Sequence, residues 1–189
     1  MNTNGELRME RLHGRPTALF DLDGTLVNTD RANSAAYRVA LDRNGAGNVL
    51  GLYGRITSSN VRNLGFAMDC VDSIVNAKVA AYCHELWRAN LGPASEAFRC
   101  VLVRRSMFDK VVLLSDGSER RVMETLNHFG WKNFFDEIVC NGGRGNKYVN
   151  YFKGFDSDPA ACVVWENEEG QIMSAIAAGV KMENIRKVG

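Results

Sequence analysis

The sequence lacks a dominant charge of either sign. It carries 23 basic and 22 acidic residues over 189 positions, and no basic block stands out. Proteins that bind nucleic acid gather lysine and arginine on one face or in one stretch, so we expect nucleic acid not to be the main partner. No pattern in the sequence predicts an oligomeric state.

Long apolar runs are also missing. No segment approaches the roughly 18 apolar residues that a membrane-spanning helix needs, and residues 1–16 lack the apolar core of a signal peptide. The five cysteines are odd in number, widely spaced and mostly within apolar runs, as is typical of reduced thiols in a protein core and not of a disulfide framework or a zinc site. The three histidines are scattered and pair with no nucleophile or metal ligand. We therefore expect a cytoplasmic protein with no membrane partner and with structural histidines.

What the sequence does have is a short apolar run that ends in two carboxylates. Residues 18–20 predict a strand of the kind buried in parallel sheets, and the segment DLDGT follows. Alternate residues of an extended chain point the same way, so Asp21 and Asp23 should project together. A hard cation such as Mg²⁺ would offset their mutual repulsion. The alternative is a β-hairpin that turns at Asp23-Gly24, because Asp-Gly between apolar runs favours that turn.

The following segment, residues 30–92, is predicted to be helix and loop with no strand. Asp30 can cap a helix that runs to about Asn44, and a short helical piece is expected near residues 61–66. The clearest periodicity in the chain comes next and ends at Gly92-Pro93. Its apolar residues recur every three or four positions: Val71, Ile74, Val75, Val79, Tyr82, Cys83, Leu86 and Trp87.

Beyond Pro93, strands and helices are predicted to alternate. Apolar runs that favour strands cover residues 111–114, 137–140 and 160–165, and a short edge strand is expected at 185–188. Helices are expected near residues 95–105, in the stretch that ends at Gly130, and before Gly179. This alternation predicts a parallel sheet with right-handed crossovers. The fold class is therefore α/β, a Rossmann-like doubly wound parallel sheet with an inserted helical cap.

The same pattern divides the chain into two expected domains. Residues 1–29 and 94–189 form the Rossmann-like core, of which residues 1–16 are an N-terminal arm. Residues 30–93 form the helical cap.

Polar residues follow each of these predicted strands. Asp21 and Asp23 follow the first, Ser115 the second, and Glu166 and Asn167 the fourth, while Lys147 lies in the loop after the third. Ligands of open α/β sheets lie at the carboxyl ends of the strands, so these groups should converge on one site. Carboxylates, a hydroxyl, a lysine and helix N-terminal amides suit Mg²⁺ and a phosphate group.

Each of these residues also has a purely local explanation. Ser115 or Asp116 could cap the following helix, and Lys147 could be a solvated loop lysine. The acidic residues at 166–169 could favour a helix N-terminus. For any one of these residues, a local role is as good an explanation as a shared site. For all of them together, a shared site is the better explanation, because it accounts for every residue at once.

Four stretches resemble the motifs of the haloacid dehalogenase superfamily. FDLDGTLVNTD (20–30) resembles the first motif in its phosphatase and phosphomutase form, VVLLSDGS (111–118) resembles the second, and NGGRGNKYVNYF (141–152) resembles the region of the third. CVVWENEEGQIMSAIAAGV (162–180) is similar to the fourth motif of the β-phosphoglucomutase-like branch, and the helical insertion is similar to that branch's cap. The resemblance extends from about residue 17 to residue 180.

The resemblance implies an Mg²⁺-dependent phosphatase that hydrolyses a small phosphomonoester through an aspartyl-phosphate. Asp21 would be the nucleophile and Asp23 the acid and base, while Ser115 and Lys147 would contact the phosphate. The implied substrate-binding residues are Gly24, Thr25, Asp116, Gly117 and Arg55. The implied metal ligands are Asp21, Asp23 through its backbone carbonyl, Glu166 and Asn167.

Three departures from the family pattern bear on this expectation. Asn167 stands where the branch usually has a metal-binding aspartate, and an amide oxygen is the weaker Mg²⁺ ligand. Asp116 replaces the usual asparagine and adds negative charge beside the expected phosphate. Lys147 is followed by Tyr148 and not by proline, which leaves Lys153 as a second candidate for the lysine.

These departures keep other functions open. One is a haloacid dehalogenase-like protein with weak or lost catalysis that binds a phosphorylated ligand or a protein; another is a phosphomutase. Arg55, in the loop at residues 51–60, could contact the distal part of a substrate or could be an ordinary solvated arginine.

Overall fold

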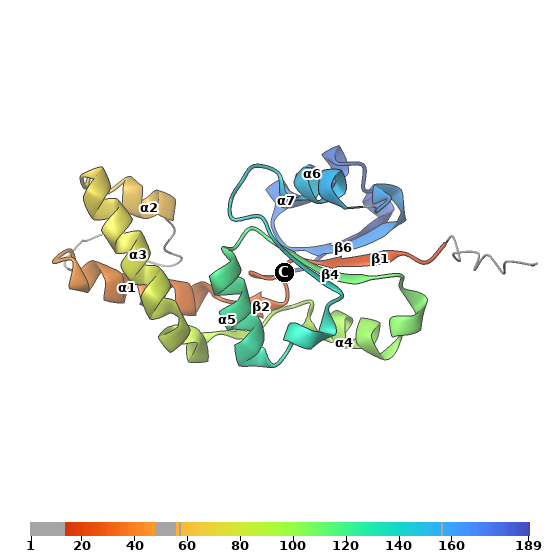
Figure 1. Ribbon diagram of the computed structural model, residues 1–189, viewed down its shortest axis with the longest axis horizontal. Coiled ribbons are helices and arrows are strands. Elements are labelled where there is room, and N and C mark those ends of the chain that lie inside the picture. Colours follow the sequence, from red (N-terminus) through yellow and green to blue (C-terminus); the bar gives the residue numbers. More distant parts are fainter. Residues whose placement is uncertain (1–13, 48–55, 57, 156) are drawn as a thin grey trace, which may run out of the picture.

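A parallel sheet of five strands, in the order β5-β4-β1-β6-β7, organises the chain (Figure 1). The computed structural model describes residues 14–47, 56, 58–155 and 157–189. The strands are β1 (Thr17–Phe20), β4 (Val111–Ser115), β5 (Glu137–Cys140), β6 (Cys162–Glu166) and β7 (Ile185–Lys187). The central strand, β1, is therefore hydrogen-bonded on both edges, and its polar continuation at Asp21 lies in the middle of the sheet's carboxyl edge.

Helices cover both faces of this sheet (Figure 1). Phe20 and Ala18 face a core formed with α4 (Ser95–Val103) and α5 (Glu119–Phe129), whereas Leu19 faces a core formed with α6 (Lys147–Gly154) and α7 (Glu169–Ala177). Successive residues of a strand point to opposite faces, so the consecutive buried apolar residues Ala18, Leu19 and Phe20 require two covered faces. The predicted doubly wound α/β fold is confirmed.

Aromatic rings fill the core on the α4 and α5 side. Phe20 stacks on Trp165 of β6, with ring centroids 4.3 Å apart, and meets the edge of Phe98 of α4 at 5.2 Å. Phe98 stacks in turn on Phe135 at 4.9 Å. These contacts attach α4 to the two strands whose ends carry Asp21 and Glu166.

The predicted helical insertion is also confirmed, and it projects away from the sheet (Figure 1). It consists of α1 (Asp30–Arg43), α2 (Ser58–Arg62) and α3 (Met68–Glu85). A separate apolar cluster that includes Leu41, Val61 and Ile74 holds these helices together. The buried face of α3 is Val71, Ile74, Lys78, Ala81 and Tyr82, so a lysine takes one of the inner positions.

The prediction that residues 30–92 contain no strand is wrong. β2 (Val27–Asn28) pairs in antiparallel fashion with β3 (Asn90–Leu91), and the two form the connection out to the cap and back. Two-residue strands are too short to produce an alternating pattern. The long periodic helix also ends earlier than expected, at Glu85, and Trp87 lies in the 3₁₀ turn after it with 66% of its surface exposed.

The local turn chemistry after β1 also differs from expectation. Asp30 is the first helical residue of α1, and the N-cap position belongs to Thr29, whose side chain makes no capping hydrogen bond. The hairpin alternative at Asp23-Gly24 is wrong, because β1 has only parallel neighbours. The amides of Leu26 and Val27 both donate to the Leu22 carbonyl, and Gly24 adopts φ of 82° in the resulting turn. The short cap helix α2 begins at residue 58 and not at 61.

The remaining regular elements of the described residues are 3₁₀ turns. They are η1 (Leu86–Arg88), η2 (Arg105–Met107), η3 (Lys132–Phe134), η4 (Pro159–Ala161) and η5 (Met182–Asn184). Within the part of the chain that the structure describes, no helix is both long and apolar enough to span a membrane. The five cysteines are free thiols, as expected, but the expectation that they lie in the core is wrong for most of them. Cys162 is buried, Cys100 is exposed, and the other three are partly buried.

The packing of Phe20 leads to a prediction about stability. Phe20→Ala should lower the free energy of unfolding by about 3–5 kcal/mol, because it leaves a cavity between Trp165 and Phe98. Val103→Ala is the control, since Val103 is 87% exposed and should change stability by less than about 0.5 kcal/mol. Urea denaturation of the three proteins measures both values. Equal midpoints for Phe20→Ala and the wild type would contradict the packing described.

Candidate active site

A small cavity of about 150 Å³ lies at the carboxyl edge of the sheet. The side chains that line it come from the ends of β1, β4 and β6 and from α1, α5, α6 and α7. They are Asp21, Asp23, Asn33, Asp116, Arg121, Lys147, Glu166, Glu168 and Gln171. Polar residues that are far apart in the sequence thus meet in one place, as parallel topology requires.

A buried lysine lies at the centre of this cavity wall. The Nζ atom of Lys147 is 2.7 Å from Oδ1 of Asp21 and 2.8 Å from Oε2 of Glu166, and 2% of the lysine side chain is exposed. Asn146 caps α6 by accepting the amides of Tyr148 and Val149, which places Lys147 in the first turn. Burial opposes the lysine's charge, but the two carboxylates outweigh burial and raise the pKa of Lys147.

Glu166 uses both of its oxygens within the protein. Oε2 accepts the hydroxyl of Tyr148 at 2.9 Å in addition to Lys147, and Oε1 accepts the amides of Asn167 at 3.0 Å and Glu168 at 3.2 Å. A carboxylate with this many donors is held in one orientation. Burial, followed by the charge of Glu166, raises the pKa of Tyr148, so its hydroxyl stays a donor.

The two aspartates after β1 have different surroundings. Burial raises the pKa of Asp21 to about 7; Lys147 opposes this shift, and the charges of Glu166 and Asp23 add to it. Asp23 instead forms a two-pronged ion pair with Arg121, in which Nη1 lies 2.6 Å from Oδ1, and it also accepts the Thr29 hydroxyl. Burial would raise the pKa of Asp23, but Arg121 outweighs burial and lowers it. The two carboxyl groups are therefore suited to different roles.

Ser115 and Asp116, at the end of β4, also differ in their placement. Ser115 is buried and accepts the Gly117 amide at 3.0 Å, but it is not among the residues that line the cavity. Asp116 does line the cavity. Its two oxygens accept side-chain amides from Asn141 at 2.7 Å and from Gln171 at 2.8 Å, which partly offset its negative charge.

The side chain of Asn167 turns toward the first motif. Its Oδ1 accepts the Thr25 hydroxyl at 3.0 Å, and a Cβ at Gly24 would collide with its amide. Asn167 is not among the residues that line the cavity, whereas its neighbour Glu168 is. Lys153, the second candidate for the lysine of the third motif, is exposed on α6. Arg55, the candidate contact to the distal part of a substrate, lies outside the described residues.

Four of the residues that line the cavity were not expected from the sequence: Asn33, Arg121, Glu168 and Gln171. Arg121 lies beside Arg120 in a helix that contains many charged residues, where an arginine is most often a solvated surface residue. The one available signal is that Arg121 and Thr125 share the side of α5 that carries the buried Val122.

The family of haloacid dehalogenase-like hydrolases matches residues 18–185. The chain belongs to this hydrolase family. Fructose-1-phosphate phosphatase YqaB of Escherichia coli (strain K12) is similar to it, with 24% identity over 193 residues, which is 89% of this chain and 95% of that protein.

Solved structures of haloacid dehalogenase-like proteins share the fold. CbbY from Rhodobacter sphaeroides, solved as a mutant in complex with xylulose-(1,5)bisphosphate, has a TM-score of 0.71 and 18% identity, covering 88% of this chain and 84% of that one. A hydrolase from Pseudomonas syringae has a TM-score of 0.66 and 14% identity, covering 88% and 82%. The protein is therefore an enzyme with the fold of its family.

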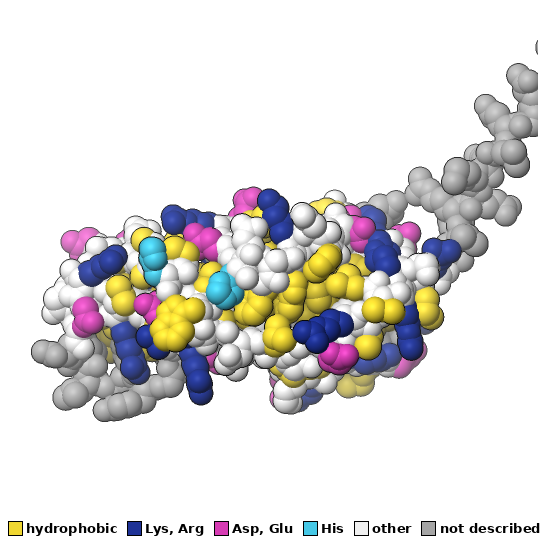
Figure 2. Space-filling model, turned by 90° about the horizontal axis from the view of Figure 1, so that it is seen from below, with side chains coloured by type: hydrophobic (Ala, Val, Ile, Leu, Met, Phe, Trp, Pro, Cys, Tyr) yellow, Lys and Arg dark blue, Asp and Glu magenta, His cyan; other side chains and the backbone are white. Residues whose placement is uncertain are grey.

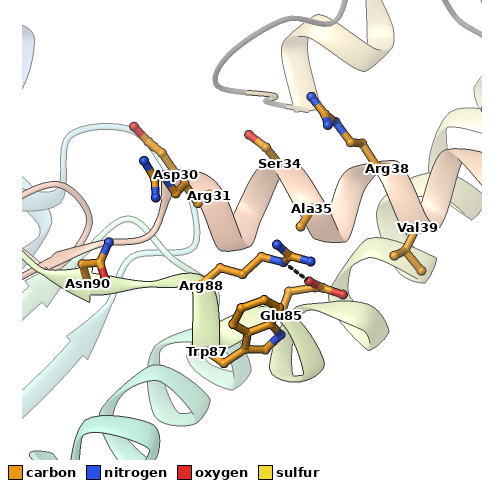
Figure 3. A pocket seen from close by; sticks show the side chains of 10 residues that line it. All are labelled: Asp30, Arg31, Ser34, Ala35, Arg38, Val39, Glu85, Trp87, Arg88 and Asn90. Atoms are coloured by element: carbon orange, nitrogen blue, oxygen red, sulfur yellow. Dashed lines mark hydrogen bonds and ion pairs between the residues drawn. The ribbon is translucent and has the colours of Figure 1, made fainter.

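This haloacid dehalogenase-like hydrolase has a second and larger cavity, of about 820 Å³, between α1 and residues 85–90 (Figure 3). Arg88 stacks on the Trp87 ring at 4.1 Å and pairs with Glu85 at 2.6 Å. On the face shown in Figure 2, basic and acidic side chains are interspersed among apolar ones. The two cavities share none of their described lining residues, so the converging carboxylates belong to the small cavity alone.

The chemistry of the small cavity fits a hard cation such as Mg²⁺. Its described lining residues include five carboxylates (Asp21, Asp23, Asp116, Glu166 and Glu168) but two cationic side chains (Arg121 and Lys147). Burial raises the pKa of Asp21, Lys147 opposes the shift, and the charges of Glu166 and Asp23 add to it. Within the described ranges, no three histidine, cysteine or acidic side chains form a ready metal site. Instead, Lys147 lies between Asp21 and Glu166, and Arg121 pairs with Asp23.

The burial of Asp21 makes stability depend on pH. The pKa of Asp21 is about 7 in the folded protein against 3.8 ordinarily, so the folded state binds the proton more tightly. Its contribution to stability is fully present below about pH 4 and is lost as the pH rises toward 7. From about pH 5 to about pH 7, the wild type should lose about 2 kcal/mol of unfolding free energy relative to Asp21→Asn.

Urea denaturation of both proteins in metal-free buffer, repeated across this pH range, checks the prediction. Asp72→Asn, at an exposed position of α3, is the control and should follow the wild type. Parallel pH curves for the wild type and Asp21→Asn would show that Asp21 titrates normally.

Proposed function

We propose that this enzyme is a phosphatase that hydrolyses a small phosphomonoester through an aspartyl-phosphate on Asp21. The observation that carries the proposal is the position of Asp21 at the end of the central strand, 2.7 Å from the buried ammonium of Lys147. A carboxylate beside a fixed cation can attack a phosphorus atom whose negative oxygens would otherwise repel it.

The first half of the reaction transfers the phosphoryl group to the enzyme. An oxygen of Asp21 forms the new bond to phosphorus, and the bond from phosphorus to the alcohol oxygen breaks. Asp23 donates a proton to the departing alcohol. Lys147 offsets charge on the phosphoryl oxygens, and Ser115 and the amides that follow it are placed at the end of the neighbouring strand β4.

The second half restores the enzyme. Asp23 accepts a proton from a water molecule as the water oxygen attacks the phosphorus, and the bond to Asp21 breaks to release phosphate. Arg121 holds Asp23 through both of its oxygens, which orients this group for both proton transfers.

Asp21, the backbone carbonyl of Asp23 and Glu166 would hold Mg²⁺. When bound, the ion would neutralise charge between the phosphate and the carboxylates and would orient the phosphate for in-line attack. Glu168 supplies a further carboxylate from the cavity wall. We assign this supporting role to Glu168 in preference to Asn167, because Glu168 lines the cavity and Asn167 does not.

The size of the cavity supports a small substrate. Its volume of about 150 Å³ is below the roughly 300–1,000 Å³ of sites for drug-sized ligands. The similar protein from Escherichia coli is named for its action on fructose-1-phosphate, and CbbY was solved with a sugar bisphosphate. Sugar phosphates are therefore the first substrates to test.

One observation favours a second candidate, a weakly active protein that binds a phosphorylated ligand. The pKa of Asp23 is lowered by Arg121 against the effect of burial, which keeps the carboxyl ionised and disfavours proton donation to an alcohol. The activity of the purified protein on a panel of phosphate esters decides between the two candidates.

The nucleophile assignment leads to a direct prediction. Asp21→Asn should reduce phosphatase turnover at least about 1,000-fold, because the covalent step loses its attacking carboxylate. Phosphate release from p-nitrophenyl phosphate and fructose-1-phosphate measures the loss, and circular dichroism shows whether the fold is retained. Asp72→Asn serves as the matched carboxylate control on the cap surface. Unchanged hydrolysis by Asp21→Asn would falsify this assignment.

The metal assignment leads to another prediction. Removal of divalent ions with a chelator should abolish turnover, and Mg²⁺ should restore it. Glu168→Gln should raise the Mg²⁺ concentration for half-maximal activity several-fold, because a carboxylate leaves the cavity wall. Asn167→Asp should change it less, since residue 167 faces Thr25. If the titrations of both variants coincide with that of the wild type, Glu168 does not support the metal.

A further inference from the structure

Two buried amide oxygens of the small cavity have no hydrogen-bond donor in the part of the chain that the structure describes. They are Oδ1 of Asn33 and Oε1 of Gln171, and both residues line the cavity. A buried acceptor without a donor loses the hydration that it had in the unfolded chain and gains nothing in return. Such atoms next to a candidate active site point to a ligand that supplies the missing donors.

The orientation of the Gln171 amide is set by its neighbour. Its Nε2 donates to Oδ2 of Asp116 at 2.8 Å, and a carboxylate oxygen can act only as an acceptor here. The nitrogen of the amide must therefore face Asp116, and the oxygen is the atom left without a donor. Gln171 lies in the first turn of α7, which follows the strand that carries Glu166.

Asn33 reaches the same cavity from the cap. It lies in the first turn of α1, and its neighbours Arg31 and Ser34 line the larger cavity shown in Figure 3, whereas Asn33 lines the small one. The two oxygens thus belong to the cap and to the core, respectively. A ligand that bonds to both would contact the two parts of the protein at once.

Resting on the proposed phosphatase function, we propose that Asn33 and Gln171 select a phosphomonoester whose carbon skeleton carries hydroxyl groups, as a polyol or sugar phosphate does. A hydroxyl is a neutral donor that suits a neutral amide acceptor. An ammonium donor would pair instead with the carboxylates of the same wall. A substrate without hydroxyls leaves both amide oxygens unpaired and binds less well.

Glycerol 1-phosphate and propyl phosphate test the proposal directly. They have the same carbon chain and phosphate and differ in two hydroxyl groups. The ratio of their kcat/KM values is measured for the wild type, Asn33→Leu and Gln171→Met. The wild type should prefer glycerol 1-phosphate, and each substitution should reduce that preference roughly tenfold, the worth of one hydrogen bond of about 1.4 kcal/mol.

The ratio separates recognition from a structural role. Gln171→Met also removes a donor from Asp116, but that loss affects the phosphate end and should slow both esters alike. Asn33→Asp keeps an oxygen acceptor and should retain the preference. Met173→Leu is the control on the outer side of α7, where residue 173 is 58% exposed, and should match the wild type. Because Asn33 and Gln171 lie on separate helices, poor folding of one variant leaves the other to decide.

Three results would overturn the proposal. One is an equal kcat/KM of the wild type for both esters, and another is a ratio that neither Asn33→Leu nor Gln171→Met changes. A third is a preference for ethanolamine phosphate over glycerol 1-phosphate, which would assign the amide oxygens to an ammonium group. In each case hydrolysis continues and the phosphatase function stands. If the wild type hydrolyses none of these esters nor p-nitrophenyl phosphate, both proposals fail together.

Discussion

The ammonium of Lys147, buried between Asp21 and Glu166, is the contact on which the rest of the site depends. The two carboxylates come from the ends of neighbouring strands, β1 and β6, and the sheet brings their charges close together away from water. Removing one partner of such a buried group leaves an uncompensated charge, at a cost of roughly 3–5 kcal/mol. The Asn146 cap, which starts α6 at Lys147, is therefore part of the site as much as of the helix.

A second consequence of this arrangement is that two aspartates nearly adjacent in the sequence have pKa values shifted in opposite directions. Asp21 is buried, and burial raises its pKa to about 7 although the charge of Lys147 opposes the shift. Asp23 is two residues away but faces Arg121 from α5, and its pKa falls. Groups of one chemical type acquire different roles through their surroundings. The proposed reaction requires this kind of asymmetry, because it uses one aspartate as a nucleophile and the other as a proton carrier.

The cap is connected to this chemistry through polar contacts as well as through β2 and β3. The hydroxyl of Tyr82 on α3 lies 3.2 Å from that of Thr125 on α5, and Arg121 lies over the Tyr82 ring. Lys78, one turn before Tyr82, lies over the same ring, and burial followed by the charge of Arg121 lowers its pKa to about 8. Asn33 adds a contact from α1 to the cavity.

The sequence alone determined the fold class and the helical insertion. It also determined which strand ends carry Asp21, Asp116 and Glu166, and that a loop leads to Lys147. Apolar periodicity and strand-end residues are local, and parallel topology then brings these ends to one edge. Only the tertiary structure decided that Arg121 binds Asp23, that Asn167 turns to Thr25, and that Asn33 and Gln171 face the cavity. Apolar periodicity indicates which side of a helix or strand is buried. It does not indicate which residue of another element that side contacts. That choice depends on how the crossovers and the cap pack, and no local pattern contains it.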